Sequence, residues 1–165
     1  MRKQKGFSLI ELLIVVAIIL IIAAIAIPNL LRARIAANES SAASGIRTIN
    51  TAEVSYFSTY QRYSASLTEL GPGGVNVACP APPAVATSCL IDGVLAMNGN
   101  PAGSGKSGYS YNVAGTATTY AANANPLTNN VTGVRSFCSI EDGVVRFQPS
   151  GGGLVCAATV APLSQ

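Results

Sequence analysis

The sequence predicts an α+β protein in which one long N-terminal α-helix carries a C-terminal antiparallel β-meander, packed on the second half of the helix. An unbroken apolar run and the amphipathic stretch that follows it predict the helix. A hydrophobic period that changes to two beyond Gly108 predicts the sheet. The expected segments are residues 1–6, 7–27, 28–63, 64–107 and 108–165.

The apolar run from Phe7 to Ile27 contains 21 residues and a single charged side chain, Glu11. A helix of this length spans about 30 Å, which is the thickness of a bilayer core. A carboxylate in such a segment costs about 2.5–3.5 kcal/mol on insertion scales, so Glu11 indicates a partner or a function. Residues 1–6 hold three basic and no acidic residues, and the positive-inside rule therefore predicts a cytoplasmic N-terminus.

The stretch from Asn29 to about Tyr63 is amphipathic, and we expect its apolar stripe to pack on the globular part. Glu53 falls inside this stripe. We expect its carboxylate to extend to the stripe edge, with a salt bridge to an arginine of a neighbouring copy as the alternative. The stripe consists of Ile35, Ala42, Ile46, Ile49, Phe57 and Tyr60.

Residues 71–108 are rich in proline and glycine and are expected to be mostly loop, with a short helix near Asp92. The later strands are expected at residues 109–113, 118–125, 134–138 and 144–148, with turns at 114–116 and 141–143. One face of this sheet should pack on the helix and the other should face solvent.

Composition limits the classes of function. Charged residues make up only 10% of the chain, against about 25% in an average protein, which fits a surface buried against copies of itself. Without residues 1–6, seven basic residues balance seven acidic ones, so a general nucleic-acid ligand is not expected. Because histidine is absent, a Ser-His-Asp or Cys-His site is excluded, and neither a catalytic residue nor a cofactor is expected. Asn100 replaces the first glycine of a phosphate-binding loop, so no nucleotide is expected either.

The four cysteines are Cys79, Cys89, Cys138 and Cys156. They lack the close spacing of zinc ligands, so no metal site is expected. An even number of cysteines after a membrane segment predicts disulfides in an oxidising compartment. Three pairings are possible; the local pairs Cys79–Cys89 and Cys138–Cys156 are favoured, and four buried free thiols are the alternative.

The stretch Lys-Gly-Phe-Ser-Leu-Ile-Glu-Leu-Leu, which begins at Lys5, resembles the class III leader of type IV pilins and their relatives. The resemblance continues through Pro28 to about Tyr63 and is looser beyond. It implies that a prepilin peptidase removes residues 1–6 by cutting between Gly6 and Phe7, and that Phe7 is then N-methylated. It also implies that the helix continues through Pro28, although a proline removes one helical hydrogen bond.

The implied function is that of a major pilin, the structural subunit of a type IV pilus. Such a subunit is a single-pass precursor in the inner membrane and then joins copies of itself, through an assembly platform, in an extracellular filament on the cell surface. Glu11 would meet the amine of Phe7 on the adjoining copy and set the register. One alternative is a major pseudopilin of type II secretion, a class that commonly carries a calcium site and usually lacks disulfides. The other is a single-pass anchor for an extracytoplasmic binding domain, which needs neither a cut at Gly6 nor an acid at Glu11.

Overall fold

The computed structural model describes residues 8–98, 105–148, 156 and 162, and the chain forms two compact units, Met1–Arg34 and Ile35–Gln165. Helix α1 (Leu9–Tyr60) contributes to both units and is continuous through Pro28, as the resemblance implied. Gly6 and Phe7 lie outside the described residues.

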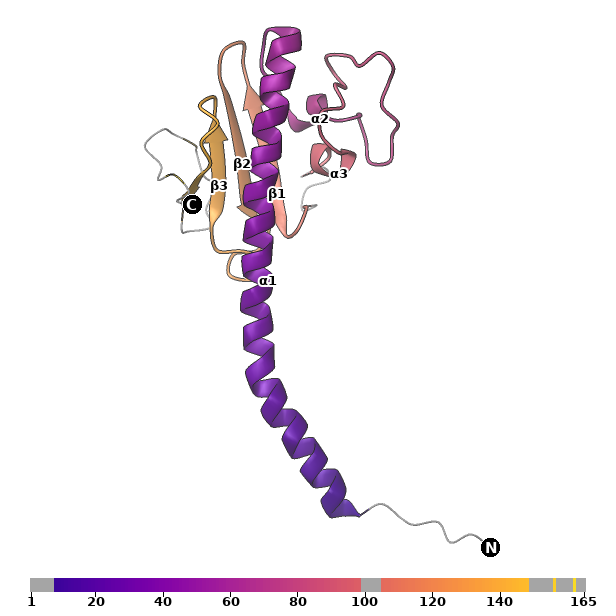
Figure 1. The fold of residues 1–165 in the computed structure, drawn as a ribbon, viewed down its shortest axis with the longest axis vertical. Coiled ribbons are helices and arrows are strands. Elements are labelled where there is room, and N and C mark those ends of the chain that lie inside the picture. The colour runs from indigo at the N-terminus through magenta and orange to yellow at the C-terminus, as the bar shows by residue number, and fades with distance from the viewer. Residues whose placement is uncertain (1–7, 99–104, 149–155, 157–161, 163–165) are drawn as a thin grey trace, which may run out of the picture. The chain divides into compact units, whose positions relative to one another are not determined.

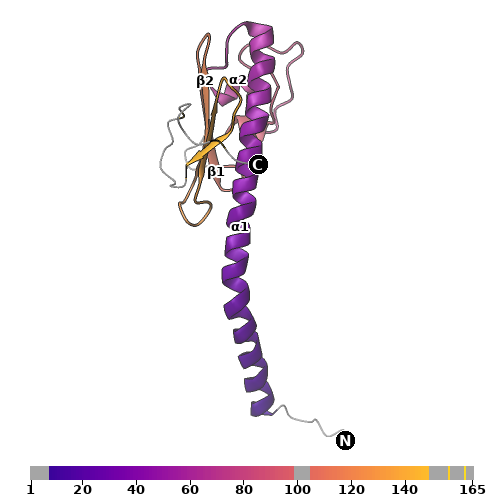
Figure 2. The same ribbon diagram turned by 60° about the vertical axis from the view of Figure 1, so that its left-hand side comes forward.

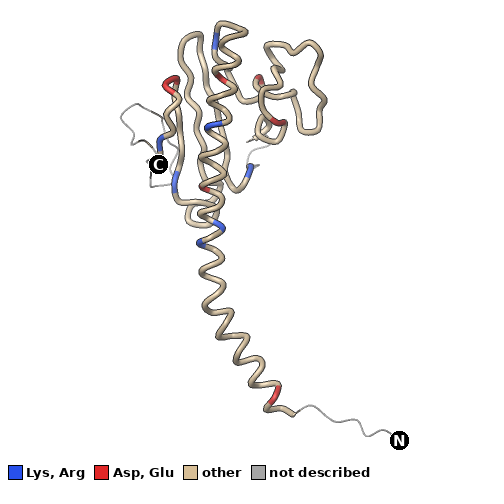
Figure 3. Tube along the Cα trace, in the orientation of Figure 1, with Lys and Arg blue, Asp and Glu red and all other residues tan. Residues whose placement is uncertain are grey.

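In the first unit, helix α1 turns its apolar side chains outward. Every large apolar residue of this stretch is between 45% and 72% exposed. Figure 3 shows a long stretch of α1 without charged residues, and in the sequence no charged residue lies between Glu11 and Arg32. Among the described helices, α1 alone is long and apolar enough to cross a membrane. An apolar surface of this extent marks a membrane or helix-packing segment.

The second unit contains a four-stranded antiparallel sheet in the order β1-β2-β3-β4, which confirms the predicted meander. In both Figure 1 and Figure 2 the sheet lies alongside the C-terminal half of α1. The first strand is longer than expected, so the first turn lies at Thr116–Thr119 and is closed by a 2.8 Å hydrogen bond from Thr116 N to Thr119 O. The strands are β1 (Tyr109–Gly115), β2 (Tyr120–Pro126), β3 (Ser136–Ile140) and β4 (Arg146–Gln148).

The core lies between α1 and one face of the sheet. On this face, large side chains of β1 stand opposite alanines of β2, with Tyr111 paired to Ala124 and Val113 to Ala122. This alternation of large and small side chains lets the helix approach the sheet closely. The helix stripe is buried at Ala42, Ile46 and Ile49, and only half-buried at Ile35, Phe57 and Tyr60.

The opposite face of the sheet is partly covered, so the expectation that it faces solvent is wrong for β3 and β4. Ser136, Cys138 and Arg146 point away from the helix and are all buried. Cys138 is bonded to Cys156, and Arg146 forms a backbone bridge with Pro162. Cys156 and Pro162 therefore lie against this edge of the sheet.

The segment between helix and sheet contains two short helices, α2 (Leu67–Leu70) and α3 (Gly93–Ala96). The first was not expected. The second is the short helix expected near Asp92, and Asp92 caps it by accepting a 3.0 Å hydrogen bond from the Leu95 N–H. Because Gly93 is the first helical residue, it does not interrupt the helix.

Candidate functional site

Glu11 lies in the first turn of α1, where its carboxylate Oε2 accepts a 3.0 Å hydrogen bond from the Ser8 N–H. Ser8 immediately precedes the helix and Glu11 is its third residue, which is the arrangement of a capping box. The carboxylate also lies at the positive end of the helix dipole. Glu11 therefore stabilises the start of its own helix. Sequence reasoning missed this role, although the pattern Ser-x-x-Glu was visible.

The charge of Glu11 has no counterpart nearby in the described part of the chain. No lysine or arginine there forms an ion pair with it, and the next charged residue along α1 is Arg32. Ser8 satisfies one carboxylate oxygen without neutralising the group. Glu11 can therefore still pair with a cation from another molecule.

In the second unit, Glu39 joins α1 to the start of β3. Its carboxylate accepts hydrogen bonds from the N–H groups of Val134 (2.9 Å) and Arg135 (3.1 Å), and forms a 2.7 Å ion pair with the Arg135 guanidinium. Burial alone would raise the pKa of Glu39, but these hydrogen bonds and the arginine outweigh it and lower the pKa.

Glu53 is fully buried, so both expectations for this residue are wrong: its carboxylate neither extends to the stripe edge nor is open to a neighbouring arginine. Beyond α1, the chain places Ser64 next to the Glu53 carboxylate. Glu53 accepts hydrogen bonds from both the N–H (3.0 Å) and the hydroxyl of Ser64. Burial raises the pKa of Glu53, although these two hydrogen bonds act in the opposite direction.

The cysteines form the two local pairs, Cys79–Cys89 and Cys138–Cys156, with Cα–Cα distances of 5.9 Å and 5.7 Å. The alternative of four free thiols is therefore wrong. The first disulfide closes the loop before α3, and the second ties the C-terminal segment to β3.

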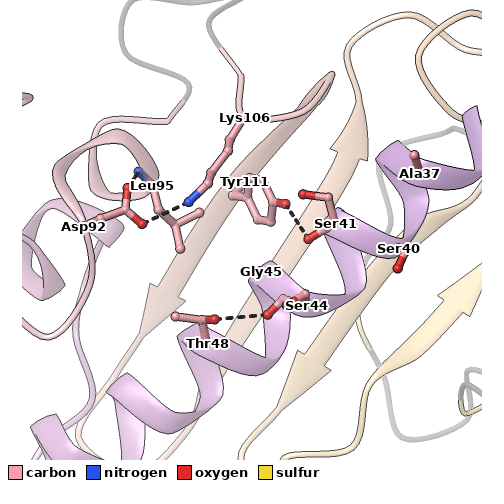
Figure 4. A pocket seen from close by; sticks show the side chains of 10 residues that line it. All are labelled: Ala37, Ser40, Ser41, Ser44, Gly45, Thr48, Asp92, Leu95, Lys106 and Tyr111. Carbon is pink, nitrogen blue, oxygen red and sulfur yellow. Dashed lines mark hydrogen bonds and ion pairs between the residues drawn. The ribbon is translucent and has the colours of Figure 1, made fainter. Parts of the chain in front are cut away.

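A hollow of about 410 Å³ lies beside α1 in the second unit (Figure 4). Its wall on the helix carries hydroxyl groups, and Tyr111 donates a 3.4 Å hydrogen bond to the Ser41 carbonyl across it. Its two charged groups, Asp92 and Lys106, pair with each other at 2.9 Å. The hollow can therefore form hydrogen bonds but has no unpaired acid or base. The described residues also contain no cluster of three or more metal-ligating side chains.

Comparisons with known proteins agree with the site at the N-terminus. Residues 1–27 match the prokaryotic N-terminal methylation motif. The type IV major pilin PilA of Myxococcus xanthus is 46% identical over 69 residues, which are 42% of this chain and 31% of that protein. The type IV wide pilus major component PilA4 of Thermus thermophilus is 68% identical over 40 residues, which are 24% of this chain and 30% of that protein. The chain thus spans about a third of the length of these relatives. Together, the methylation motif and the two relatives support membership of this chain in the type IV pilin family, as the resemblance of its leader implied.

Proposed function

We propose that this chain is the major pilin of a type IV pilus. The observation that carries the proposal is the division of α1, whose first part exposes an uncharged apolar surface after Glu11 while its second part belongs to a compact unit. The relatives named as major pilins support the same assignment. A structural role follows, with the chain held in the inner membrane before assembly and on the cell surface afterwards.

Assembly begins with removal of residues 1–6 by a prepilin peptidase and methylation of Phe7. The apolar helices of successive copies then pack together away from water, with the aid of an assembly platform. The amine of Phe7 on one copy pairs with Glu11 on the adjoining copy. A shifted register leaves a carboxylate buried and unpaired, which is strongly unfavourable, so this pair selects one register.

The hydrogen bond from Ser8 to Glu11 allows a test that separates the charge from the helix cap. Glu11→Gln keeps an oxygen that can accept the Ser8 N–H but removes the charge, whereas Glu11→Ala removes both. We expect both variants to lower the yield of sheared surface filaments about tenfold. Ser58→Ala, an exposed change farther along α1, is the control and should leave the yield unchanged. Normal assembly of Glu11→Gln would show that Glu11 acts only as a cap.

Intact mass spectrometry of the sheared material tests the processing steps. We expect the loss of residues 1–6, one added methyl group, and a deficit of four hydrogens for the two disulfides. The disulfides favour a pilus over the type II secretion alternative. An uncut chain that remains in the membrane fraction would instead support the anchored binding domain and overturn the proposal.

A further inference from the structure

Most charged side chains of the compact unit form ion pairs within the chain. Every charged residue outside residues 1–6 lies in the described part, where four ion pairs are present. Glu53 is buried against Ser64. In the unit Ile35–Gln165, the exposed charges that remain without an ion pair in the described part are one cation, Arg47, and one anion, Glu141.

Arg47 borders a hollow of about 230 Å³ between α1 and β3. The wall formed by α1 consists of Ala36, Ser40 and Ala43, which share one helix face with Arg47 because they lie three or four residues apart. Phe137 of β3 also lines the hollow, but it is only 1% exposed and the Arg135 guanidinium lies 5.7 Å from its ring centroid. Glu39 and Arg135 also line the hollow but neutralise each other at 2.7 Å, so its net charge comes from Arg47.

Glu141 lies in the turn between β3 and β4, which is closed by a 2.9 Å hydrogen bond from Gly143 N to Ile140 O. The neighbouring Asp142 is occupied, because it accepts a hydrogen bond from the Val144 N–H and forms an ion pair with Arg146. Val144 is 41% exposed. The turn thus presents one free negative charge beside an exposed apolar side chain.

We propose that the β3–β4 turn of one copy docks into the α1–β3 hollow of a second copy, where Glu141 pairs with Arg47. The charges are complementary, and each surface combines its charge with an exposed apolar neighbour, Val144 on the turn and Ala36 in the hollow. The two surfaces differ, so the contact is heterologous, and such a contact builds an open helical array unless its rotation closes a ring. This inference rests on the proposed function, because it names a contact between the globular units of a filament.

A charge exchange tests the contact in the full-length chain in its native host. Arg47→Glu and Glu141→Lys each place like charges opposite one another, and we expect each to lower the yield of sheared filaments about tenfold. The double variant restores the attraction and should return to within about twofold of the wild-type yield. Thr59→Glu and Asn112→Lys add charge at exposed positions elsewhere in the unit and are the controls. Normal yields from both single variants, or no recovery in the double variant, would overturn the contact.

Carbodiimide coupling provides a second readout that does not depend on yield. Lys106 is the only lysine outside residues 1–6, and Arg47→Lys adds a second one while keeping the charge. Carbodiimide activates the Glu141 carboxylate, and attack by the new amine forms an amide and releases a urea. We expect a ladder of covalently linked copies that contains this bond, and its loss in Arg47→Lys/Glu141→Gln.

The ion pair between Lys106 and Asp92, at 2.9 Å, should give an intrachain link in every sample and serves as the internal control. Peptide mapping distinguishes the Glu141 link from one between the Phe7 amine and Glu11. If Arg47→Lys filaments form but the Glu141 link is absent from them while the Lys106 link is present, the contact is wrong and the pilus function stands. If no filaments form at all, the proposed function fails first.

Discussion

The two parts of α1 belong to one continuous helix, but the first exposes its apolar side chains and the second buries them. Up to Arg34, every large apolar side chain is between 45% and 72% exposed, whereas Ile46 and Ile49 in the second part are fully buried. Both parts are helical, so propensity does not separate them. The first part is apolar on all sides and needs lipid or other helices around it. The second part carries alanine, serine and glycine among its isoleucines, which leaves room for the sheet to supply its core.

The acidic residues of the two parts differ in the same way. Glu11 accepts a cap hydrogen bond from Ser8 and has no ion pair in the described chain. Glu39 and Glu53 are both satisfied from within the compact unit, the first by Arg135 and backbone N–H groups and the second by Ser64. The proposed assembly role requires that the charge of Glu11 stay available, whereas Glu39 and Glu53 already have partners inside the fold.

The largest expected difference in the free energy of unfolding is between isoleucine-to-alanine substitutions in the two parts of α1. Ile46→Ala opens a cavity in the core and should lower the free energy of unfolding of the compact unit by about 2–5 kcal/mol. Ile18→Ala changes a side chain that is 52% exposed and should leave that free energy unchanged. Thermal unfolding of both variants in detergent measures the difference. Equal destabilisation would mean that the two parts do not unfold independently.

The second comparison uses pH to separate Glu39 from Glu53. The pKa of Glu39 is lowered in the folded state, so its contribution to stability is present above its ordinary pKa and is lost as the pH falls through the lowered value. The pKa of Glu53 is raised, so its contribution is fully present below its ordinary pKa and is lost as the pH rises through the raised value.

Denaturant unfolding between pH 3 and pH 8 measures this contrast with the variants Glu39→Gln and Glu53→Gln. We expect Glu39→Gln to cost about 1–3 kcal/mol near neutral pH, and the cost to shrink on acidification. For Glu53→Gln, the stability of the wild type relative to the variant should fall as the pH rises. Parallel pH curves for the two variants would contradict the opposite pKa shifts.

Local patterns in the sequence were sufficient for the long helix, the antiparallel meander and the favoured cysteine pairs. Apart from two local features, the cap of α1 by Ser8 and Glu11 and the short helix α2, the features that were missed depend on contacts between different elements of the chain. Glu39 meets Arg135 across 96 positions, and Cys156 returns to cover the outer face of β3. No spacing rule on a single element reveals such contacts, which is why Glu53 was expected at an edge although it is buried.

Gly115 shows how one residue can support two interpretations. In the sequence it marked a turn, because glycine favours turns. In the structure it ends β1, where a Cβ atom would collide with the carbonyl oxygen of Ser64. Ser64, which donates hydrogen bonds to Glu53, therefore leaves room only for glycine at position 115. Gly115 and Glu53, which the sequence explained separately, are thus both constrained by the position of Ser64.

The smallest expected effect concerns Gly45, where the second part of α1 meets the sheet. Alanine is preferred over glycine in a helix by about 1 kcal/mol, but a Cβ at this position would lie 2.5 Å from Cε1 of Tyr111. Displacing the buried ring costs about 1–3 kcal/mol, so Gly45→Ala should lower the free energy of unfolding by about 1 kcal/mol. The exposed Ser44→Ala is the matched control and should stabilise the unit slightly, as measured by denaturant unfolding of both variants. If Gly45→Ala stabilised the unit as much as Ser44→Ala, the close approach of helix and sheet would not be limited by Tyr111.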